Sequence, residues 1–252
     1  MSRNFELLDQ LRKTQEMLQT ESEPGLGPIL PSAEFTATVP ALEIDTATRE
    51  EIGKLVQRLF LLPGNTAHHV VFSGTESGDG CSWICARAGE ILASQVTSSV
   101  CIVDCSVRSP SMHQQFKVDN HYGLIDSLIG DGPIRQYAQP LSRPNLWLVS
   151  CGATNENSQE LLTSDRMRVR IAELRAQFNY VLMDVAPFNV CNHAMVFGGL
   201  SDGLVLVLKA NSTRRDATRE IKQQLQAANV RMLGAVLNQR TFPIPERIYN
   251  KL

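Results

Sequence analysis

Short apolar runs alternate with longer amphipathic segments along most of this 252-residue chain. The apolar runs are rich in β-branched residues and predict strands at residues 69–73, 100–104, 145–149, 180–184, 203–209 and 232–237. The segments between them predict helices at residues 82–94, 123–129, 158–177, 191–199 and 214–228. This alternation predicts an α/β fold with a mainly parallel, doubly wound sheet that helices cover on both faces.

The first 45 residues lack this alternation, and a separate helix follows them. Residues 1–20 predict an amphipathic N-terminal helix, because leucines recur among charged and amide side chains. Residues 21–45 are interrupted by prolines and glycines, a composition that favours a flexible linker. An apolar stripe over residues 46–62, ended by a Pro-Gly pair, predicts the first helix of the core. We therefore expect one domain over residues 46–252.

Charge and apolar content narrow the classes of partner and compartment. The formal net charge is −2, so we expect no binding to nucleic acid that is driven by overall charge. No apolar stretch reaches the ~18 residues that a membrane span needs, and residues 1–6 lack the apolar core of a signal peptide. These features predict a cytoplasmic protein.

The six cysteines fall mostly within apolar strand or helix patterns. Burial in a reducing compartment explains them more simply than disulfide bonds do. Two pairs separated by three residues, Cys81 with Cys85 and Cys101 with Cys105, leave a zinc site as a minor alternative.

Residues 73–82 read Ser-Gly-Thr-Glu-Ser-Gly-Asp-Gly-Cys-Ser and lie between a predicted strand and a predicted helix, as a phosphate-binding loop does. Gly78 and Gly80 let the backbone approach phosphate oxygens, and the helix N-terminus adds a positive dipole end. Ser82 stands where a hydroxyl binds Mg²⁺, but Cys81 stands where a lysine neutralises the phosphates. We expect weaker nucleotide binding than in a complete loop, with an ordinary glycine-rich turn as the alternative. The candidate nucleotide-binding residues of this segment are Gly78, Asp79, Gly80, Cys81, Ser82 and Trp83.

Two of the predicted strands end in a carboxylate, Asp104 in one and Asp184 in the other. The carboxyl ends of parallel strands share one edge of a sheet, so we expect both acids beside the glycine loop. There they would hold Mg²⁺ together with Ser82, and Asp104 is also the candidate catalytic residue. The alternative for each acid is a helix cap or a loop carboxylate.

Two further polar residues follow predicted strands. Asn238 has two interpretations: its amide reads an adenine edge, or it is an ordinary turn residue. Arg108 lies shortly after Asp104, and the commoner role of such an arginine is a salt bridge at the surface.

From about residue 45 to the C-terminus, the sequence resembles the bacterial tyrosine kinases of capsule and exopolysaccharide systems, a branch of the MinD/ParA-like P-loop ATPases. Besides the glycine loop, the resemblance rests on residues 102–110, 152–167, 184–187 and 234–238. These segments resemble, in order, the family's second Walker motif, its Gly…Glu-Leu-Leu segment, its Walker B strand and its adenine-side strand. The resemblance implies a three-layer P-loop NTPase sandwich that binds ATP or ADP with Mg²⁺.

Three residues of the candidate site depart from the pattern of an active kinase. Cys81 replaces the loop lysine, and Ser106 replaces the second aspartate of the second Walker motif. Trp83 stands where a small hydroxyl residue is usual, and its indole would crowd the phosphates. These departures predict impaired chemistry.

The segments that the family uses for assembly and as phosphorylation targets depart as well. In the helix that resembles the family's ring-forming helix, Lys54 and Gln57 replace two arginines and cannot reproduce a planar guanidinium fork. The C-terminal tail carries one tyrosine, Tyr249, where active relatives carry a cluster. Homo-oligomerisation stays open.

The resemblance implies three functions. The first is a catalytically impaired homologue of the tyrosine autokinases, which regulates or scaffolds exopolysaccharide synthesis and export at the inner face of the membrane with a membrane-embedded copolymerase. The second is an active autokinase in which Lys209 or Arg240 replaces the missing lysine. The third is a positioning ATPase of the MinD/ParA kind. Such ATPases usually carry a lysine early in the glycine loop, where this chain has Thr75 and Glu76.

Overall fold

The computed structural model describes residues 44–64 and 67–240. The helix predicted at residues 1–20, nearly all of the predicted linker and Tyr249 lie outside the described residues. None of the described helices is both long and apolar enough to cross a membrane.

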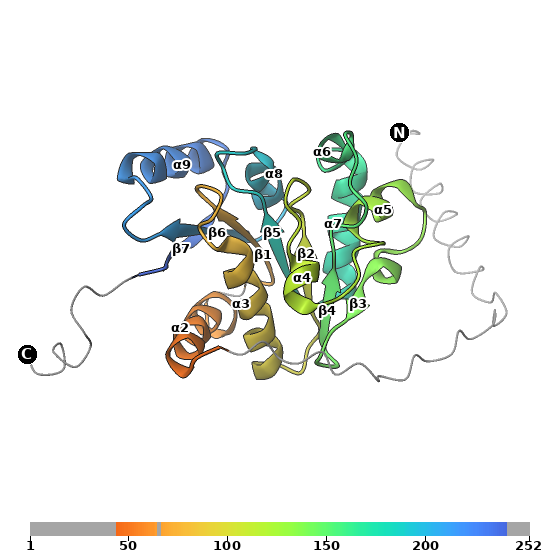
Figure 1. Cartoon of the computed structure of the whole chain (residues 1–252), viewed down its shortest axis with the longest axis horizontal. Helices are drawn as coiled ribbons and strands as arrows, with labels where there is room; N and C mark the ends of the chain where they lie inside the picture. The colour runs from red at the N-terminus through yellow and green to blue at the C-terminus, as the bar shows by residue number, and fades with distance from the viewer. Residues whose placement is uncertain (1–43, 65–66, 241–252) are drawn as a thin grey trace, which may run out of the picture. The chain divides into compact units, whose positions relative to one another are not determined.

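The core of the chain is a seven-stranded sheet with the order β3-β4-β2-β5-β1-β6-β7 (Figure 1). The strands are β1 (His69–Gly74), β2 (Val100–Asp104), β3 (Gln139–Pro140), β4 (Leu146–Val149), β5 (Tyr180–Val185), β6 (Gly203–Lys209) and β7 (Met232–Asn238). Neighbouring strands run parallel except β3, which pairs antiparallel with β4 at one edge. The predicted mainly parallel sheet is confirmed.

Helices cover both faces of this sheet (Figure 1). One face carries α2 (Thr46–Val56), the π-helical turn η1 (Gln57–Leu61), α3 (Cys81–Gln95) and α4 (Met112–Phe116). The other carries α5 (Leu124–Ile129), α7 (Asp165–Gln177), α8 (His193–Gly199) and α9 (Arg215–Ala227). Two shorter elements, the 3₁₀ turn η2 (Ile134–Tyr137) and α6 (Ser158–Leu161), complete the described part. The arrangement is the predicted three-layer sandwich.

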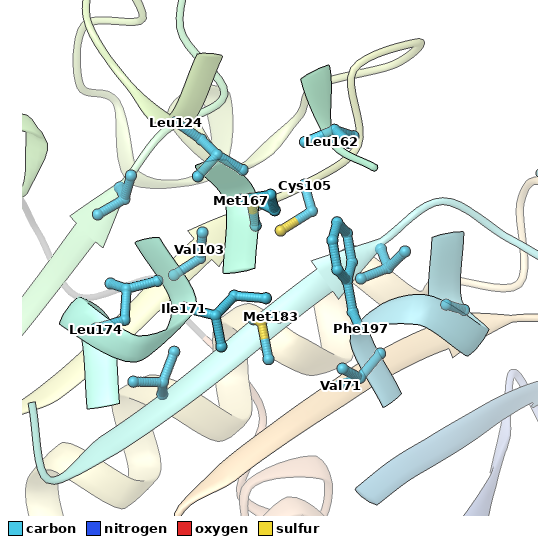
Figure 2. Close-up of a cluster of buried hydrophobic side chains, with 14 of the residues drawn as sticks. Val71, Val103, Cys105, Leu124, Leu162, Met167, Ile171, Leu174, Met183 and Phe197 are labelled. Atoms are coloured by element: carbon cyan, nitrogen blue, oxygen red, sulfur yellow. The ribbon is translucent and has the colours of Figure 1, made fainter. Parts of the chain in front are cut away.

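Figure 2 shows how the second face is packed. Met183 and Val103 from adjacent strands meet Ile171 and Leu174 of α7, and Phe197 of α8 closes the cluster beside Val71. All six of these side chains are at most 4% exposed. The central strands β1, β2 and β5 are buried on both faces, which explains why they read as continuous apolar runs in the sequence.

The helix predicted over residues 158–177 is wrong as a single element, because α6 ends at Leu161 and α7 begins at Asp165. The Thr163 hydroxyl donates to the Glu160 carbonyl at 3.0 Å, and the Ser164 hydroxyl donates to the Leu161 carbonyl at 2.6 Å. Such local side-chain bonds compete with the helical backbone pattern and interrupt it.

Other boundaries differ by less. The helix predicted over residues 46–62 changes from α-helix to a π-helical turn after Val56, and the helices predicted from residues 123 and 191 begin at Leu124 and His193. The short α4, η2 and β3 were not predicted. They span two to five residues, too few to show a hydrophobic period.

All six cysteines lie within the described residues and are free. Burial raises the pKa of five thiols, those of Cys81, Cys85, Cys101, Cys105 and Cys151. Over residues 44–64 and 67–240, no group of three or more His, Cys, Asp or Glu side chains is placed to hold a metal ion. The zinc alternative therefore has no support in this part of the chain.

Candidate functional site

The glycine loop and both strand-end acids lie at the same edge of the sheet. Asp104 at the end of β2 is directly opposite Asp184 near the end of β5 in the parallel register. On its other side β5 pairs with β1, from which the glycine loop continues into α3. The structure therefore brings together the residues that sequence reasoning placed in one crevice.

Two glycines shape the loop. Gly78 has a φ of 91° and Gly80 a φ of 81°, in the left-handed region that other residues rarely adopt. A Cβ atom on Gly80 would also lie 2.2 Å from Nδ2 of Asn238. Gly80 is the N-cap of α3, so the helix begins at Cys81 with its first amides turned toward the loop.

Asp79 braces the loop from within. Its Oδ2 accepts hydrogen bonds from the Thr75 amide at 2.8 Å, the Thr75 hydroxyl at 2.7 Å and the Glu76 amide at 2.9 Å. Asp79 and Thr75 are both buried. The predicted nucleotide-binding role of Asp79 is thus matched by a structural one, which was visible in the sequence only as a Thr-x-x-x-Asp spacing.

Asn238 holds the loop from β7. Its Nδ2 donates to the Asp79 carbonyl at 2.9 Å, and Nε2 of Gln239 donates to the Gly78 carbonyl at 3.3 Å. The amide donor that was expected to read an adenine edge is therefore engaged by the loop itself. The adenine-reading role stays a prediction.

Asp104 is fully buried, and both of its carboxylate oxygens accept hydrogen bonds. Its Oδ1 accepts from the Ser106 amide, and its Oδ2 accepts from the amides of Ser111 and Met112, each at 3.0 Å. Burial raises the pKa of Asp104, although these three amides act in the opposite direction. The helix-cap alternative therefore describes Asp104 well, because its carboxylate caps the start of α4.

Asp184 is also buried, but one of its oxygens is unsatisfied. Oδ2 has no hydrogen-bond partner among the described residues. Burial, with a further contribution from the neighbouring Asp104 charge, raises the pKa of Asp184 to about 8, and hydrogen bonds from Ser82 and Cys81 partly offset the rise. A buried acceptor without a donor fits a cation ligand, so Ser82 and Asp184 fit the metal side of a Mg²⁺ nucleotide site.

Cys81 supplies no positive charge to this site. Burial, and then the Asp184 carboxyl, raise the pKa of the Cys81 thiol well above its ordinary value. The raised pKa keeps the thiol neutral, so Cys81 is not a reactive thiolate. The groups that set the pKa of Asp184 are Asp104, Ser82 and Cys81, and none of these is a cation.

Trp83 stands in the first turn of α3 with 36% of its surface exposed. The Arg87 guanidinium lies 5.9 Å from the Trp83 ring and 2.7 Å from the Glu90 carboxylate. The buried Arg87 guanidinium thus makes a cation–π contact with the indole. Whether it crowds a bound phosphate stays a prediction.

Two of the remaining basic candidates belong to the ends of β6 and β7. Lys209 and Arg240 both line a cavity of about 640 Å³ at the ends of β6 and β7. Arg108 is exposed, and its Nη2 donates to Gln159 at 3.4 Å, in keeping with a surface role. Sequence reasoning missed Arg215, which lines the same cavity, since nothing in the local pattern distinguishes it from other surface arginines of a helix.

No protein-family model matches the chain. The chain is 27% identical over 169 residues to the tyrosine-protein kinase YwqD of Bacillus subtilis, an alignment that covers 67% of this chain and 71% of YwqD. The homologues of this chain are bacterial tyrosine-protein kinases. The succinoglycan biosynthesis transport protein ExoP of Rhizobium meliloti is 25% identical over 181 residues, which cover 71% of this chain and 23% of ExoP. The chain therefore spans about a quarter of the length of the larger relatives that it matches.

Solved structures agree on the fold. The chimerical protein CapA2B2 superposes with a TM-score of 0.71 at 24% identity, covering 77% of this chain and 85% of the chimera. The septum site-determining protein MinD of Pyrococcus horikoshii, complexed with Mg-ADP, superposes with a TM-score of 0.55 at 20% identity over 73% of this chain and 75% of MinD. This chain thus has the P-loop NTPase fold that the MinD/ParA ATPases share.

Proposed function

We propose that this chain is a regulatory or scaffolding homologue of the bacterial tyrosine kinases, with impaired phosphoryl transfer and weak or no binding of nucleotide. The proposal assigns the phosphate loop to residues 78–83 and the metal side to Ser82, Asp104 and Asp184. Asn238 completes the site on the nucleotide side. The proposed role in exopolysaccharide biosynthesis is supported by the relative ExoP, which is named a succinoglycan biosynthesis transport protein.

The observation that carries the proposal is the neutral thiol of Cys81 beside the buried Asp184 carboxyl. An active site of this class needs a positive charge at that position, because the transferred phosphoryl group is stabilised mainly by electrostatics. A charged hydrogen bond contributes about 1.5–3 kcal/mol, so its loss weakens nucleotide binding by about tenfold to a few hundredfold. Asp184 near neutral pH is itself protonated much of the time, which weakens the attraction for Mg²⁺.

The partner that suits such a role is a membrane-embedded polysaccharide copolymerase. The chain would then sit at the inner face of the cell membrane through that partner. The fusion of CapA with CapB sequence in the chimera CapA2B2 supports the idea that a kinase of this fold is compatible with a partner segment joined to it.

The alternative of an active autokinase has one observation in its favour: Lys209 and Arg240 line a common cavity at the same edge of the sheet as the loop. The alternative of a positioning ATPase has no comparable support. Proteins of that kind usually carry a lysine early in the loop, and this chain has Thr75 and Glu76 there.

The test is calorimetric titration of MgADP and MgATP into the full chain and into Cys81→Lys, with Cys191→Lys as the control for an added charge elsewhere. We expect Cys81→Lys to bind at least about tenfold more tightly than the wild type, and Cys191→Lys to match the wild type. Incubation with radiolabelled ATP and Mg²⁺ should label an active homologue and not this chain. Self-labelling of the wild-type chain would establish the active-kinase alternative instead.

A further inference from the structure

A second concave site lies beside the phosphate loop, and none of the residues assigned to the nucleotide site lines it. A cavity of about 640 Å³ opens where β6 and β7 end and α9 begins, and we call it the α9 pocket. Figure 1 shows α9 at the end of the sheet that carries β7, opposite the edge formed by β3. The lining residues are Leu208, Lys209, Ala210, Asn211, Thr213, Arg215, Thr218, Leu237 and Arg240.

The α9 pocket has the charge of an anion site. Three cationic side chains line it, those of Lys209, Arg215 and Arg240, and no carboxylate does. Within the described part of the chain, no ion pair involves Lys209 or Arg215. Acidic Asp216 in the first turn of α9 is paired with Arg219 instead. A lysine and an arginine that form no ion pair in the described part of the chain are suited to the recognition of a phosphate group.

The backbone at the pocket adds to this preference. Arg215 is the first residue of α9, and its N-cap Arg214 provides no side-chain capping bond. The first amides of the helix therefore have no side-chain acceptor at the cap, and the helix dipole favours an anion there.

Part of the pocket lining is apolar. Leu208 and Leu237 line it, and Leu237 is 56% exposed, although it belongs to a strand. A bare phosphate ion would neutralise the cations and leave these leucines in water. A ligand that covers the leucines as well gains about 25 cal/mol for each Å² of apolar surface that it buries. A cavity of this size is in the range of small-molecule sites.

We propose that the α9 pocket binds a ligand in which a phosphate group is joined to an apolar, ring-like body, with the phosphate on Lys209 and Arg215 and the ring against Leu208 and Leu237. A phosphotyrosine side chain and a nucleotide are two sources of this chemistry. The pocket reaches the phosphate loop through Thr213, whose hydroxyl lies 3.4 Å from that of Thr75. A ligand there is positioned to bias the loop without entering it.

The test titrates O-phosphotyrosine amide, ADP without metal, tyrosine amide and inorganic phosphate into the full chain, with amide chemical shifts and calorimetry as readouts. We expect the phosphorylated ring compounds to shift α9 and the ends of β6 and β7, and to bind at least about tenfold more tightly than tyrosine amide or phosphate alone. Whichever of O-phosphotyrosine amide and ADP binds more tightly identifies the source.

Variants assign the binding to the pocket. We expect Arg215→Ala to weaken binding of the phosphorylated ring compound by about tenfold or more, and Arg219→Ala, on the same helix but outside the pocket, to leave it within about twofold. Leu237→Ala should weaken binding of the phosphorylated ring compound but not binding of inorganic phosphate. Circular dichroism of each variant checks that it is folded.

Two results would overturn the inference: no binding of either phosphorylated ring compound, or binding that Arg215→Ala leaves unchanged. The outcome is separable from the proposed function, because different variants test the two sites: Arg215→Ala removes a cation that lines the α9 pocket, and Cys81→Lys adds one to the phosphate loop. ADP that binds in the phosphate loop instead responds to Cys81→Lys and not to Arg215→Ala.

Discussion

Asp79 shows how a single buried carboxylate shapes the glycine loop. Its Oδ2 accepts from two amides and one hydroxyl, and the residue is 3% exposed. Replacement by alanine leaves buried donors unpaired, so we expect Asp79→Ala to lower the free energy of unfolding by roughly 2–4 kcal/mol. Asp79→Asn keeps one acceptor oxygen and should cost about half as much. Urea denaturation followed by circular dichroism measures both.

The control for this prediction is Glu76→Ala, in the same loop but with an exposed side chain. Surface substitutions of this kind usually change stability by within about 0.5 kcal/mol. An Asp79→Ala midpoint equal to that of Glu76→Ala would show that the loop does not depend on the brace.

Asp184 gives a dependence of stability on pH. Its pKa is about 8 in the folded chain and 3.8 for an unperturbed carboxyl. Between these values the unfolded chain has released a proton that the folded chain keeps, so the folded state loses about 1.4 kcal/mol of stability per pH unit as pH rises. Asp184→Asn removes this loss. We therefore expect the gain in Tm of Asp184→Asn over the wild type to grow between about pH 5 and about pH 8.

Thermal unfolding across that pH range, followed by circular dichroism, tests the expectation. Asp165→Asn removes a fully exposed carboxylate and serves as the matched control, with a Tm difference that stays nearly constant with pH. A constant difference for Asp184→Asn as well would mean that its carboxyl is ionised in the folded chain at neutral pH.

At the scale of elements, the sequence predicts the two acids but not what surrounds them. Asp104 and Asp184 were predicted to be neighbours because apolar runs locate parallel strands, and parallel strands align their carboxyl ends. The engagement of Asp104 was not predictable, because it depends on the five-residue helix α4, which has no hydrophobic period of its own. The break between α6 and α7 was readable in principle, from adjacent hydroxyl residues at Thr163 and Ser164.

The cap on α4 leads to a local prediction. Asparagine at position 104 offers one acceptor oxygen in place of two, so at least one of the Ser106, Ser111 and Met112 amides loses its partner. We expect Asp104→Asn to speed hydrogen exchange in residues 105–116 by about tenfold or more, since an unpaired buried donor costs about 1–3 kcal/mol. Hydrogen-exchange mass spectrometry resolves this segment.

The comparison variant is Asp126→Asn at the start of α5, where Oδ2 accepts from the Gly123 amide at 2.9 Å. It should loosen α5 and leave α4 unchanged. Equal exchange in α4 for Asp104→Asn and the wild type would assign the stability of that helix to packing of Met112 and Phe116 rather than to its cap.

At the scale of the whole molecule, the alternation of strands and helices was enough to predict the layers, because burial on two faces imposes apolar strands. The strand order was not predictable in the same way. It depends on crossovers that bring β1 between β5 and β6, and on β3, a two-residue antiparallel edge that propensity cannot detect. The α9 pocket belongs to this scale too, since its lining comes from β6, α9 and the end of β7.

Assembly is the last property that belongs to the whole molecule, and the prediction for it concerns α2. In the helix that resembles the ring-forming helix of the family, Lys54 is exposed and its ammonium lies 2.6 Å from Glu51 of the same helix. A lysine paired within its own helix and a neutral Gln57 cannot reproduce the planar guanidinium fork of the two arginines that the resemblance implies at these positions. We expect the wild-type chain to stay smaller than a ring in mass photometry, and the double variant Lys54→Arg with Gln57→Arg to form larger assemblies.

The control is the double variant Lys222→Arg with Gln223→Arg on α9, which adds the same charge away from α2 and should stay small. Ring-sized particles of the wild type, or equal assembly of both double variants, would show that α2 does not determine the oligomeric state.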